Sequence, residues 1–144
     1  MTAYQVRVVQ GSFRQVAENL DTATLVFYDS LFEMAPHLER MFRSTREEQA
    51  QKMAQILCAV VKTLDHPEQI LPAVRQLGRR HAGYGVKPDQ YGLMGETLLW
   101  TLERCLGAAF TPDVRDGWAA AYDMLASTMQ EAAEQVAMET AAAA

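Results

Sequence analysis

The chain has 144 residues, a length typical of one compact domain, and folding at this size buries roughly 68–70% of the unfolded chain's surface. Hydrophobic residues make up 49% of the chain and charged residues 22%, a composition that excludes a disordered or fibrous protein. The net charge of -5 argues against nucleic acid as a partner, because a phosphate backbone attracts basic surfaces.

The start of the chain carries no targeting or membrane signal. Arg7, Arg14 and Glu18 interrupt its apolar positions, so it lacks the unbroken apolar stretch of a signal peptide or a membrane span. We therefore expect a cytoplasmic protein with no membrane partner. Cys58 and Cys105 stand far apart in apolar helical patterns, which favours reduced core thiols over a disulfide or a metal pair.

The spacing of apolar residues is helical along almost the whole chain. We predict one globular domain over residues 1–139, followed by an Ala-rich tail over 140–144 that frays. The first predicted helix covers about 2–20. A second begins at Asp21, whose carboxylate is expected to cap it, and ends near Pro36.

A long helix is predicted in the first half of the chain, after a short turn over 36–42. Ser44 and Glu47 form an S-x-x-E capping box, which marks the start of this helix, and its apolar stripe continues to about Leu64. The sequence therefore predicts a long helix from about Ser44 to about Leu64.

Proline and glycine divide the second half of the chain into further helices. Pro67 suits the first turn of a helix, and Gly83 and Gly85 supply the permissive backbone that ends one. Two more helices are predicted over 88–107 and from Pro112 onward. Six or seven helices joined by short loops make an all-α protein.

His81 is the one histidine that helical spacing places on a core-facing stripe, one turn after Leu77. Two interpretations stay open for it. In the last turn of a helix it can bond free carbonyls and oppose the helix dipole. Alternatively it can bind the iron of a porphyrin, which needs one imidazole on a rigid helix and a wide apolar slot. His37 and His66 adjoin prolines at helix starts and are predicted to lie on the surface.

Three further side chains suit the polar side of such a slot. Gln49 and Met53 lie one turn apart on the predicted long helix, where they either face a bound ligand or take ordinary places in a first turn and a core. Tyr28 stands on the buried stripe of an apolar helix, so its hydroxyl needs a partner. A bound diatomic molecule, Gln49 and a backbone carbonyl are all candidates.

Motifs for other cofactors are missing from the sequence. It contains no dinucleotide fingerprint, no P-loop, no H-E-x-x-H and no Cys or His at zinc spacing. The eight methionines form no M-x-x-M cluster, which disfavours a copper site. A porphyrin is the cofactor that these residues accommodate best.

Several of these motifs together resemble the globin family over about residues 5–129. The stretch LVFYDSLF over 25–32, then Pro36 and Phe42, matches the family's second helix and the turn that ends in its haem-packing phenylalanine. The run LGRRHAGYGV over 77–86 and the run LGAAFTP over 106–112, with the later Trp118 and Tyr122, are similar to neuroglobin and to bacterial single-domain haemoglobins.

The resemblance implies a three-over-three helical sandwich around b-type haem, with His81 as the proximal iron ligand. O2, CO or NO would bind on a distal face formed by Tyr28, Gln49 and Met53. Lys52 and Arg80 are the implied partners of the haem propionates. The remaining implied pocket residues are Phe27, Phe42, Leu77, Val86, Tyr91, Met94 and Leu98.

The distal side departs from neuroglobin, in which a histidine binds the iron itself. Gln49 is a poor iron ligand, so we expect a ferrous iron that is five-coordinate and open. Closure by Tyr28 or Lys52 in the ferric state remains an alternative.

The proximal side departs from bacterial haemoglobins and flavohaemoglobins, which use a tyrosine and a glutamate to strengthen the histidine's donor character. Tyr91 matches the tyrosine, but the expected glutamate position is Ala133, with Glu131 and Glu134 beside it. This difference weakens the case for peroxide or dioxygenase chemistry.

The function that the resemblance implies is reversible binding, and by extension transport, of O2 or another diatomic gas. Alternatives are an NO dioxygenase or nitrite reductase, a gas or redox sensor, and a haem-free interaction module. Whether the protein is an enzyme stays open. Since no reductase segment follows in the sequence, turnover would need a separate flavin reductase as electron donor. We expect a monomer or a homodimer.

Overall fold

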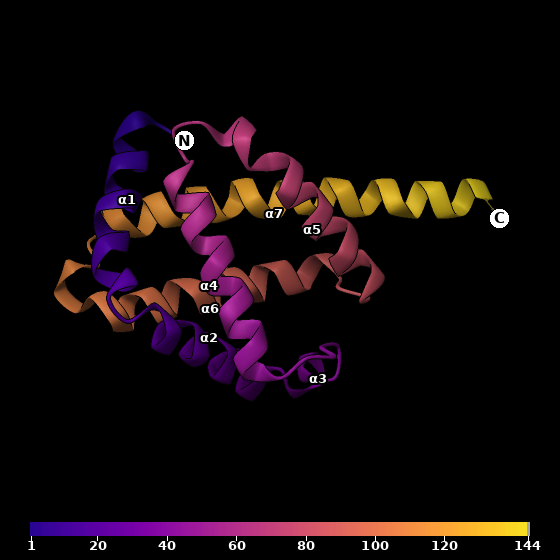
Figure 1. Ribbon diagram of the computed structural model, residues 1–144, viewed down its shortest axis with the longest axis horizontal. Coiled ribbons are helices and arrows are strands. Elements are labelled where there is room, and N and C mark those ends of the chain that lie inside the picture. Colours follow the sequence, from indigo (N-terminus) through magenta and orange to yellow (C-terminus); the bar gives the residue numbers. More distant parts are fainter. Residues whose placement is uncertain (144) are drawn as a thin grey trace.

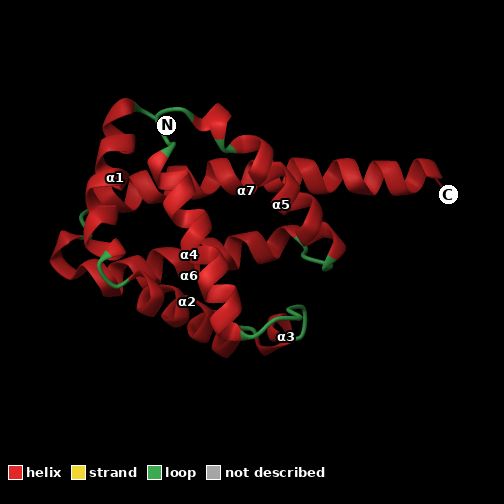
Figure 2. Cartoon of the chain, viewed as in Figure 1, coloured by secondary structure: helices red, strands yellow, loops and turns green. Residues whose placement is uncertain are grey.

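The computed structural model describes residues 1–143, and Figures 1 and 2 show that this part of the chain consists of helices joined by short loops. It contains no strand in those residues, which confirms the all-α prediction. The α-helices are α1 (Ala3–Ala17), α2 (Leu20–Met34), α3 (Pro36–Glu39), α4 (Arg46–Lys62), α5 (Leu71–Gly83), α6 (Pro88–Leu106) and α7 (Pro112–Ala143). Two 3-10 turns, η1 (Pro67–Gln69) and η2 (Gly107–Ala109), join the later helices.

The helices form two crossed layers (Figure 1). In one layer lie α1, α4 and α5, and they cross over α2, α6 and α7 in the other. The closest packing across the layers is that of α5 on α7, α1 on α7 and α4 on α2. The helices α4 and α5 share a layer but do not pack closely on each other.

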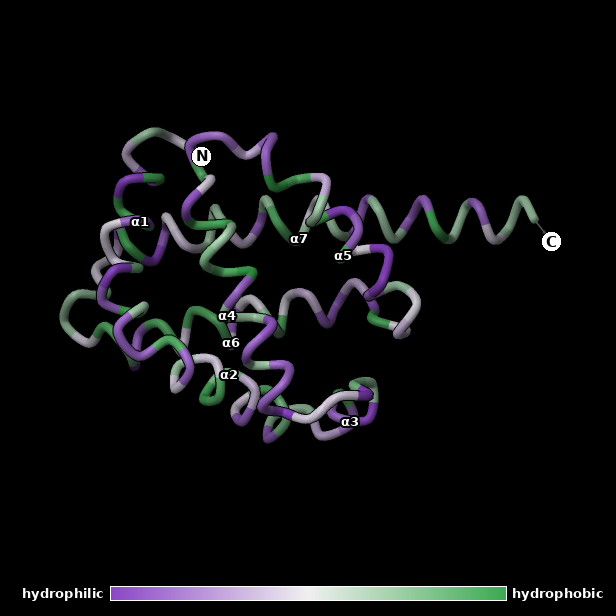
Figure 3. Tube along the Cα trace, viewed as in Figure 1, coloured by the Kyte–Doolittle hydropathy of each residue, from purple (hydrophilic) through white to green (hydrophobic). Residues whose placement is uncertain are grey.

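The apolar core has two parts. The larger part is centred on Val9 and Leu31, both completely buried, and joins α1, α2, α4 and α6 with the start of α7. The smaller part consists of Val74, Tyr91, Ala126 and Met129, on α5, α6 and α7. Figure 3 shows that α4 changes from hydrophilic at its start to hydrophobic over its last turns, where it enters the larger part.

The backbones of α5 and α7 touch at Gly78. A Cβ atom on this glycine would lie 2.5 Å from the carbonyl oxygen of Met129, a distance that real Cβ atoms essentially never show. Only glycine therefore permits this helix pair to approach so closely. His81, the candidate iron ligand, follows within one turn of this contact on α5.

The predicted cap of α4 is wrong by one residue. Thr45, not Ser44, is the cap residue, and its hydroxyl accepts a hydrogen bond from the backbone N–H of Glu48 at 3.1 Å. Both registers satisfy the capping pattern, but Ser44 is occupied, because its hydroxyl accepts a hydrogen bond from the side-chain amide of Gln49. The helix accordingly begins at Arg46.

The predicted start of α2 also differs. The helix begins at Leu20, and the cap residue Asn19 makes no side-chain hydrogen bond to it. Asp21 lies inside the first turn instead of capping it. Its carboxylate still favours the helix there, because the first turn carries the positive end of the helix dipole.

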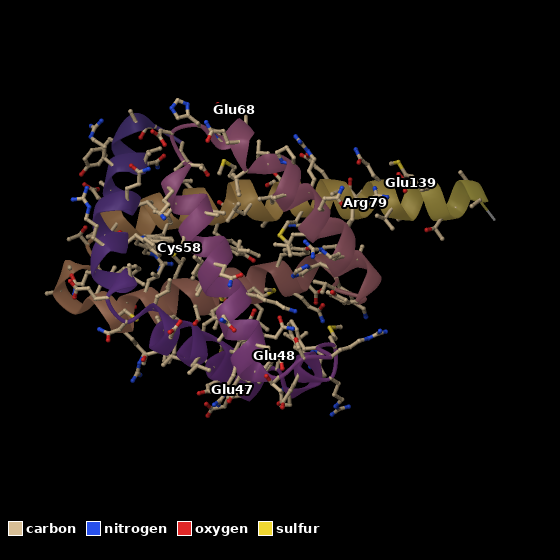
Figure 4. The ribbon with its side chains drawn as sticks, viewed as in Figure 1. Glu47, Glu48, Cys58, Glu68, Arg79 and Glu139 are labelled. Atoms are coloured by element: carbon tan, nitrogen blue, oxygen red, sulfur yellow. The ribbon has the colours of Figure 1, made fainter. Side chains whose placement is uncertain are left out.

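The end of α7 extends beyond the rest of the molecule in Figure 1. It is helical through Ala143, where we had predicted fraying from residue 140, and Ala144 lies outside the described residues. Arg79 on α5 and Glu139 form a salt bridge of 2.9 Å, and Figure 4 shows them side by side. None of the helices within residues 1–143 combines the length and apolar character that crossing a membrane requires.

Candidate functional site

A cavity of about 400 Å³ lies between α4 and α5 and borders on both parts of the core. Every predicted site residue lines it except Val86. The predicted residues on its wall are Phe27, Tyr28, Phe42, Gln49, Lys52, Met53, Leu77, Arg80, His81, Tyr91, Met94 and Leu98. Residues far apart in the sequence thus meet at one place, mostly through apolar side chains.

Val86 lies behind the cavity wall. It packs against the smaller part of the core, and its backbone N–H donates to the carbonyl oxygen of His81 at 3.1 Å. The loop that follows α5 folds back under the helix end, because Gly85 adopts a φ of 83°, in the left-handed region. Val86 therefore anchors the end of α5 and does not form part of the cavity surface.

The imidazole of His81 has a defined tautomer. Its Nδ1 lies 2.8 Å from the carbonyl oxygen of Leu77, one turn earlier in α5. Because a carbonyl oxygen only accepts hydrogen bonds, Nδ1 carries the proton and Nε2 keeps its lone pair. Burial lowers the pKa of His81, the bond to Leu77 opposes that change, and the charge of Arg80 adds to it. A neutral imidazole with a free Nε2 is the form that binds a metal.

Across the cavity, Tyr28 is 7% exposed and lies among phenylalanine rings. Its ring centroid is 5.0 Å from that of Phe27, 5.7 Å from that of Phe32 and 5.9 Å from that of Phe42. Burial raises the pKa of Tyr28 to about 12, so the hydroxyl keeps its proton at neutral pH. Within residues 1–143 this hydroxyl takes part in no hydrogen bond, although Gln49 and backbone carbonyls were candidates.

Gln49 stands near Tyr28 on the cavity wall. One N–H of its side-chain amide donates a hydrogen bond to the hydroxyl of Ser44. A primary amide carries two N–H groups, so a second donor remains. Tyr28 on α2 and Gln49 on α4 together bring two neutral hydrogen-bond donors to the cavity that His81 lines from α5.

The mouth of the cavity is marked by the side chains that both line it and are exposed to solvent, which are Lys52, Gln55, Arg80 and Tyr84. The two charged members are both basic, and they come from the two opposite helices α4 and α5. A ligand that extends carboxylates toward the mouth would meet a cation on each side.

Tyr91 has an unusual hydroxyl, because this buried oxygen makes no hydrogen bond with any described residue. Its backbone is fixed instead: the hydroxyl of Tyr122, whose ring packs over Gly95, donates to the carbonyl oxygen of Tyr91 at 2.6 Å. Burial raises the pKa of Tyr91. The Tyr91 hydroxyl is therefore a buried polar group that the described residues leave without a hydrogen bond, on a residue that lines the cavity.

The protein side chains do not form a metal site on their own. Within residues 1–143 no group of three His, Cys, Asp or Glu side chains is placed to hold a metal ion. An iron bound by His81 would therefore need further ligands that the described residues do not supply, and a porphyrin would provide them. The apolar walls, the free Nε2 and the basic mouth fit such a group.

Sequence reasoning missed part of the wall, namely Gln55, Ile56, Leu57, Tyr84, Tyr122, Leu125, Ala126 and Met129. For most of these residues, helical spacing already placed the side chain on the same apolar face as a predicted pocket residue or as one another. Ile56 and Leu57 continue the stripe of Met53, and the members on α7 share one helical face. Tyr84 gave no such signal, because it follows the end of a helix and its direction depends on how the loop turns.

The chain matches the Globin family over residues 25–129, and it belongs to that family. It is similar to the flavohemoprotein of Halalkalibacterium halodurans, with 32% identity over 123 residues, which cover 83% of this chain and 30% of that protein. The flavohemoprotein of Bacillus subtilis is 30% identical over 124 residues, covering 84% of this chain and 31% of that protein. The chain spans about a third of the length of these relatives.

Solved structures agree with the fold. An engineered carbene transferase, made from a candidate nitric oxide dioxygenase of Rhodothermus marinus, matches with a TM-score of 0.90 and 26% identity, covering 98% of this chain and 99% of that one. A hexacoordinated haem protein from a tardigrade has a TM-score of 0.82 at 19% identity, a likeness of fold alone, covering 93% of this chain and 96% of that one. These matches confirm the three-over-three globin fold, and membership of the family implies haem binding.

Proposed function

We propose that the protein binds b-type haem with His81 as the axial iron ligand, and that it binds O2 or another diatomic gas reversibly on the opposite side. The observation that carries this proposal is one cavity lined by His81 on α5, whose Nδ1 is bonded to Leu77, and by two neutral donors, Tyr28 and Gln49, on other helices. When bound, the haem supplies an iron that can take a gas molecule as a ligand.

The residues of the chain divide the remaining tasks. Leu77 orients the imidazole through its carbonyl oxygen, and the apolar walls exclude water. Lys52 and Arg80 lie where they can neutralise carboxylates at the mouth. Tyr28, which keeps its proton at neutral pH, would donate a hydrogen bond to a bound gas molecule that carries partial negative charge. Slow release of O2 follows.

The second candidate is an NO dioxygenase supported by a separate electron donor. The similarity to flavohemoproteins and to the Rhodothermus marinus protein favours it. The proximal side disfavours it, because the Nδ1 proton of His81 is bonded to a neutral carbonyl oxygen, and no carboxylate contributes to the pKa of this histidine. A neutral partner makes the imidazole a weaker electron donor than a carboxylate would.

The absorption spectrum of the purified protein, ferric and then reduced by dithionite, tests the proposal. We expect a Soret band and, in the ferrous form, one broad visible band, which indicates an open iron site. The variant His81→Ala should lose or alter these bands, whereas the exposed His37→Ala should not. Absence of a Soret band after addition of haem would refute haem binding. Sharp split bands in the ferrous form would refute an open site.

Consumption of NO separates the two candidates. The oxygenated protein, supplied with NADH and a flavin reductase, is mixed with repeated additions of NO. If the protein is a gas carrier, each molecule consumes NO about once and then remains ferric. Sustained consumption over many additions would establish the dioxygenase.

A further inference from the structure

We propose that the outward face of α6 is the surface through which two copies of this chain bind each other. The surface consists of Glu96, Trp100 and Arg104 and is named here the Trp100 row. None of these three side chains lines the cavity between α4 and α5. The Trp100 row is therefore separate from the site of the proposed function.

Trp100 is a large aromatic side chain that the fold leaves at the surface. It is 42% exposed, whereas Trp118, the other tryptophan of the chain, is 3% exposed. The helix α6 packs on α2 and on α7 within its layer (Figure 1), and its buried side, which includes Leu98 and Leu102, joins the larger part of the core. Tryptophan is among the residues most enriched at the centres of protein interfaces, where burial of its ring contributes strongly to binding. An exposed tryptophan on an otherwise well-packed helix therefore indicates a binding surface.

An exposed charge lies one turn from Trp100 on each side. Glu96 precedes it by four residues and Arg104 follows it by four, and both are exposed. Residues four apart are neighbours on the surface of a helix. The guanidinium carbon of Arg104 lies 4.8 Å from the centroid of the Trp100 ring, a cation–π contact. The Trp100 row thus runs from a negative charge through an aromatic ring to a positive charge.

This order of charges matches itself when the row is inverted. If a two-fold axis at Trp100 relates two copies, the two α6 helices run antiparallel, and Glu96 of each copy faces Arg104 of the other. Rows of residues four apart form ridges, and packing between such ridges is the commonest class of helix contact. The exposed Glu103 falls opposite position 97, where Thr97 is buried, so no glutamate directly faces a glutamate. Two attractive charge pairs therefore flank one pair of tryptophan rings.

The self-matching charges favour a second copy over an unrelated partner. Each copy carries a net charge of -5, so two copies repel each other at long range. At an ionic strength of about 0.15 M the Debye length is about 8 Å, which screens this repulsion more than it weakens charges in direct contact. We therefore expect a reversible dimer whose strength depends on the Trp100 row.

Sedimentation velocity of the purified protein measures the dissociation constant of this dimer, at about 0.15 M salt and over protein concentrations from about 1 μM to 1 mM. The variants are Trp100→Ala, Glu96→Arg and Arg104→Glu. The matched control is Arg14→Glu, which makes the same change of net charge as Arg104→Glu at an exposed position of α1, in the other layer. Circular dichroism equal to that of the wild type shows that a variant without a dimer is still folded.

We expect the wild type to form a dimer, and Trp100→Ala to raise the dissociation constant at least about 30-fold, as removal of an interface hot spot does. Glu96→Arg places arginine against arginine twice across the axis, and Arg104→Glu places glutamate against glutamate twice, so each should raise the constant at least about tenfold. Arg14→Glu should leave it unchanged. A wild type that stays monomeric at about 1 mM, or equal weakening by Arg14→Glu and Arg104→Glu, would overturn the proposal.

A mixture of the two charge variants distinguishes this antiparallel arrangement from other contacts of α6. Glu96→Arg has arginine at both ends of its row, and Arg104→Glu has glutamate at both ends. Each variant alone should be mainly monomeric, but together they place arginine opposite glutamate at both positions. The equimolar mixture should therefore sediment as a dimer about as strong as that of the wild type. If the mixture remains monomeric, the two α6 helices do not pair through the Trp100 row and the proposal is wrong.

Discussion

The contact between Gly78 on α5 and Met129 on α7 makes a sharp prediction about stability. A Cβ atom at Gly78 would lie 2.5 Å from the Met129 carbonyl oxygen and 2.6 Å from its Cα, where ordinary contacts begin at 3.4 Å. Both atoms belong to the backbone, so neither can turn aside. The substitution Gly78→Ala must therefore push the two helices apart by about 1 Å.

The size of the effect follows from two opposing terms. Overpacking a well-packed core costs about 1–3 kcal/mol. Alanine in a helix regains about 1 kcal/mol relative to glycine. Because the contact is so short, we take the upper part of the overpacking range, and we expect Gly78→Ala to lower the free energy of unfolding by about 2 kcal/mol. For a chain of this size that lowers Tm by about 4–8 °C.

The control is Gly92→Ala on α6. A Cβ at Gly92 meets nothing within 4 Å, so only the propensity gain remains, and Tm should rise by about 2–4 °C. Thermal unfolding followed by circular dichroism measures both variants. Because His81 lies within a turn of Gly78, the first variant should also lose haem faster than the second. If Gly78→Ala stabilises the protein as Gly92→Ala does, the close backbone contact is wrong.

Three other predictions concern single side chains. Tyr28→Phe removes a neutral hydrogen-bond donor from the cavity. Loss of a hydrogen bond of about 1.5–3 kcal/mol to bound O2 should make O2 dissociate roughly 10- to 100-fold faster. An unchanged dissociation rate in stopped-flow measurements would contradict this role of Tyr28. Its pKa of about 12 lies above the ordinary 10.0, so the stability that Tyr28 contributes is complete below pH 10 and is lost toward pH 12. Over that interval urea unfolding should show the wild type losing about 2–3 kcal/mol more than Tyr28→Phe. In the same assay Thr45→Ala should lower the free energy of unfolding by about 1 kcal/mol, and Ser44→Ala should lower it clearly less. The reverse order would show that Ser44 caps α4.

Much of this protein was predictable from local pattern. Apolar spacing and the positions of proline and glycine gave the helices, because both act over a few residues of backbone. The ends of the helices were less certain, as Ser44 and Thr45 show. Both hydroxyls satisfy the same motif, and in the structure Thr45 caps α4 while Ser44 accepts a hydrogen bond from Gln49.

Part of the candidate site was also predictable. His81, Tyr28 and Gln49 were selected from spacing and from resemblance, and the fold brings all three to one cavity. The sequence did not show that Val86, unlike the other predicted pocket residues, does not line the cavity. Whether it faces the cavity or supports the helix end depends on the turn at Gly85, and the same turn directs Tyr84 to the mouth.

The sequence by itself determined which helices form, which histidine faces inward and which side chains have the chemistry to hold a porphyrin, since these depend on residue type and periodicity. Only the tertiary structure decided the unpartnered hydroxyl of Tyr91 and the joining of Lys52 with Arg80 at one opening, whereas the tautomer of His81 follows from a bond within α5 itself. The reason is physical. Whether a buried hydroxyl finds a partner and which side chains share a cavity mouth depend on distances between helices, and those are set by contacts such as that of Gly78 with Met129, between residues far apart in the chain.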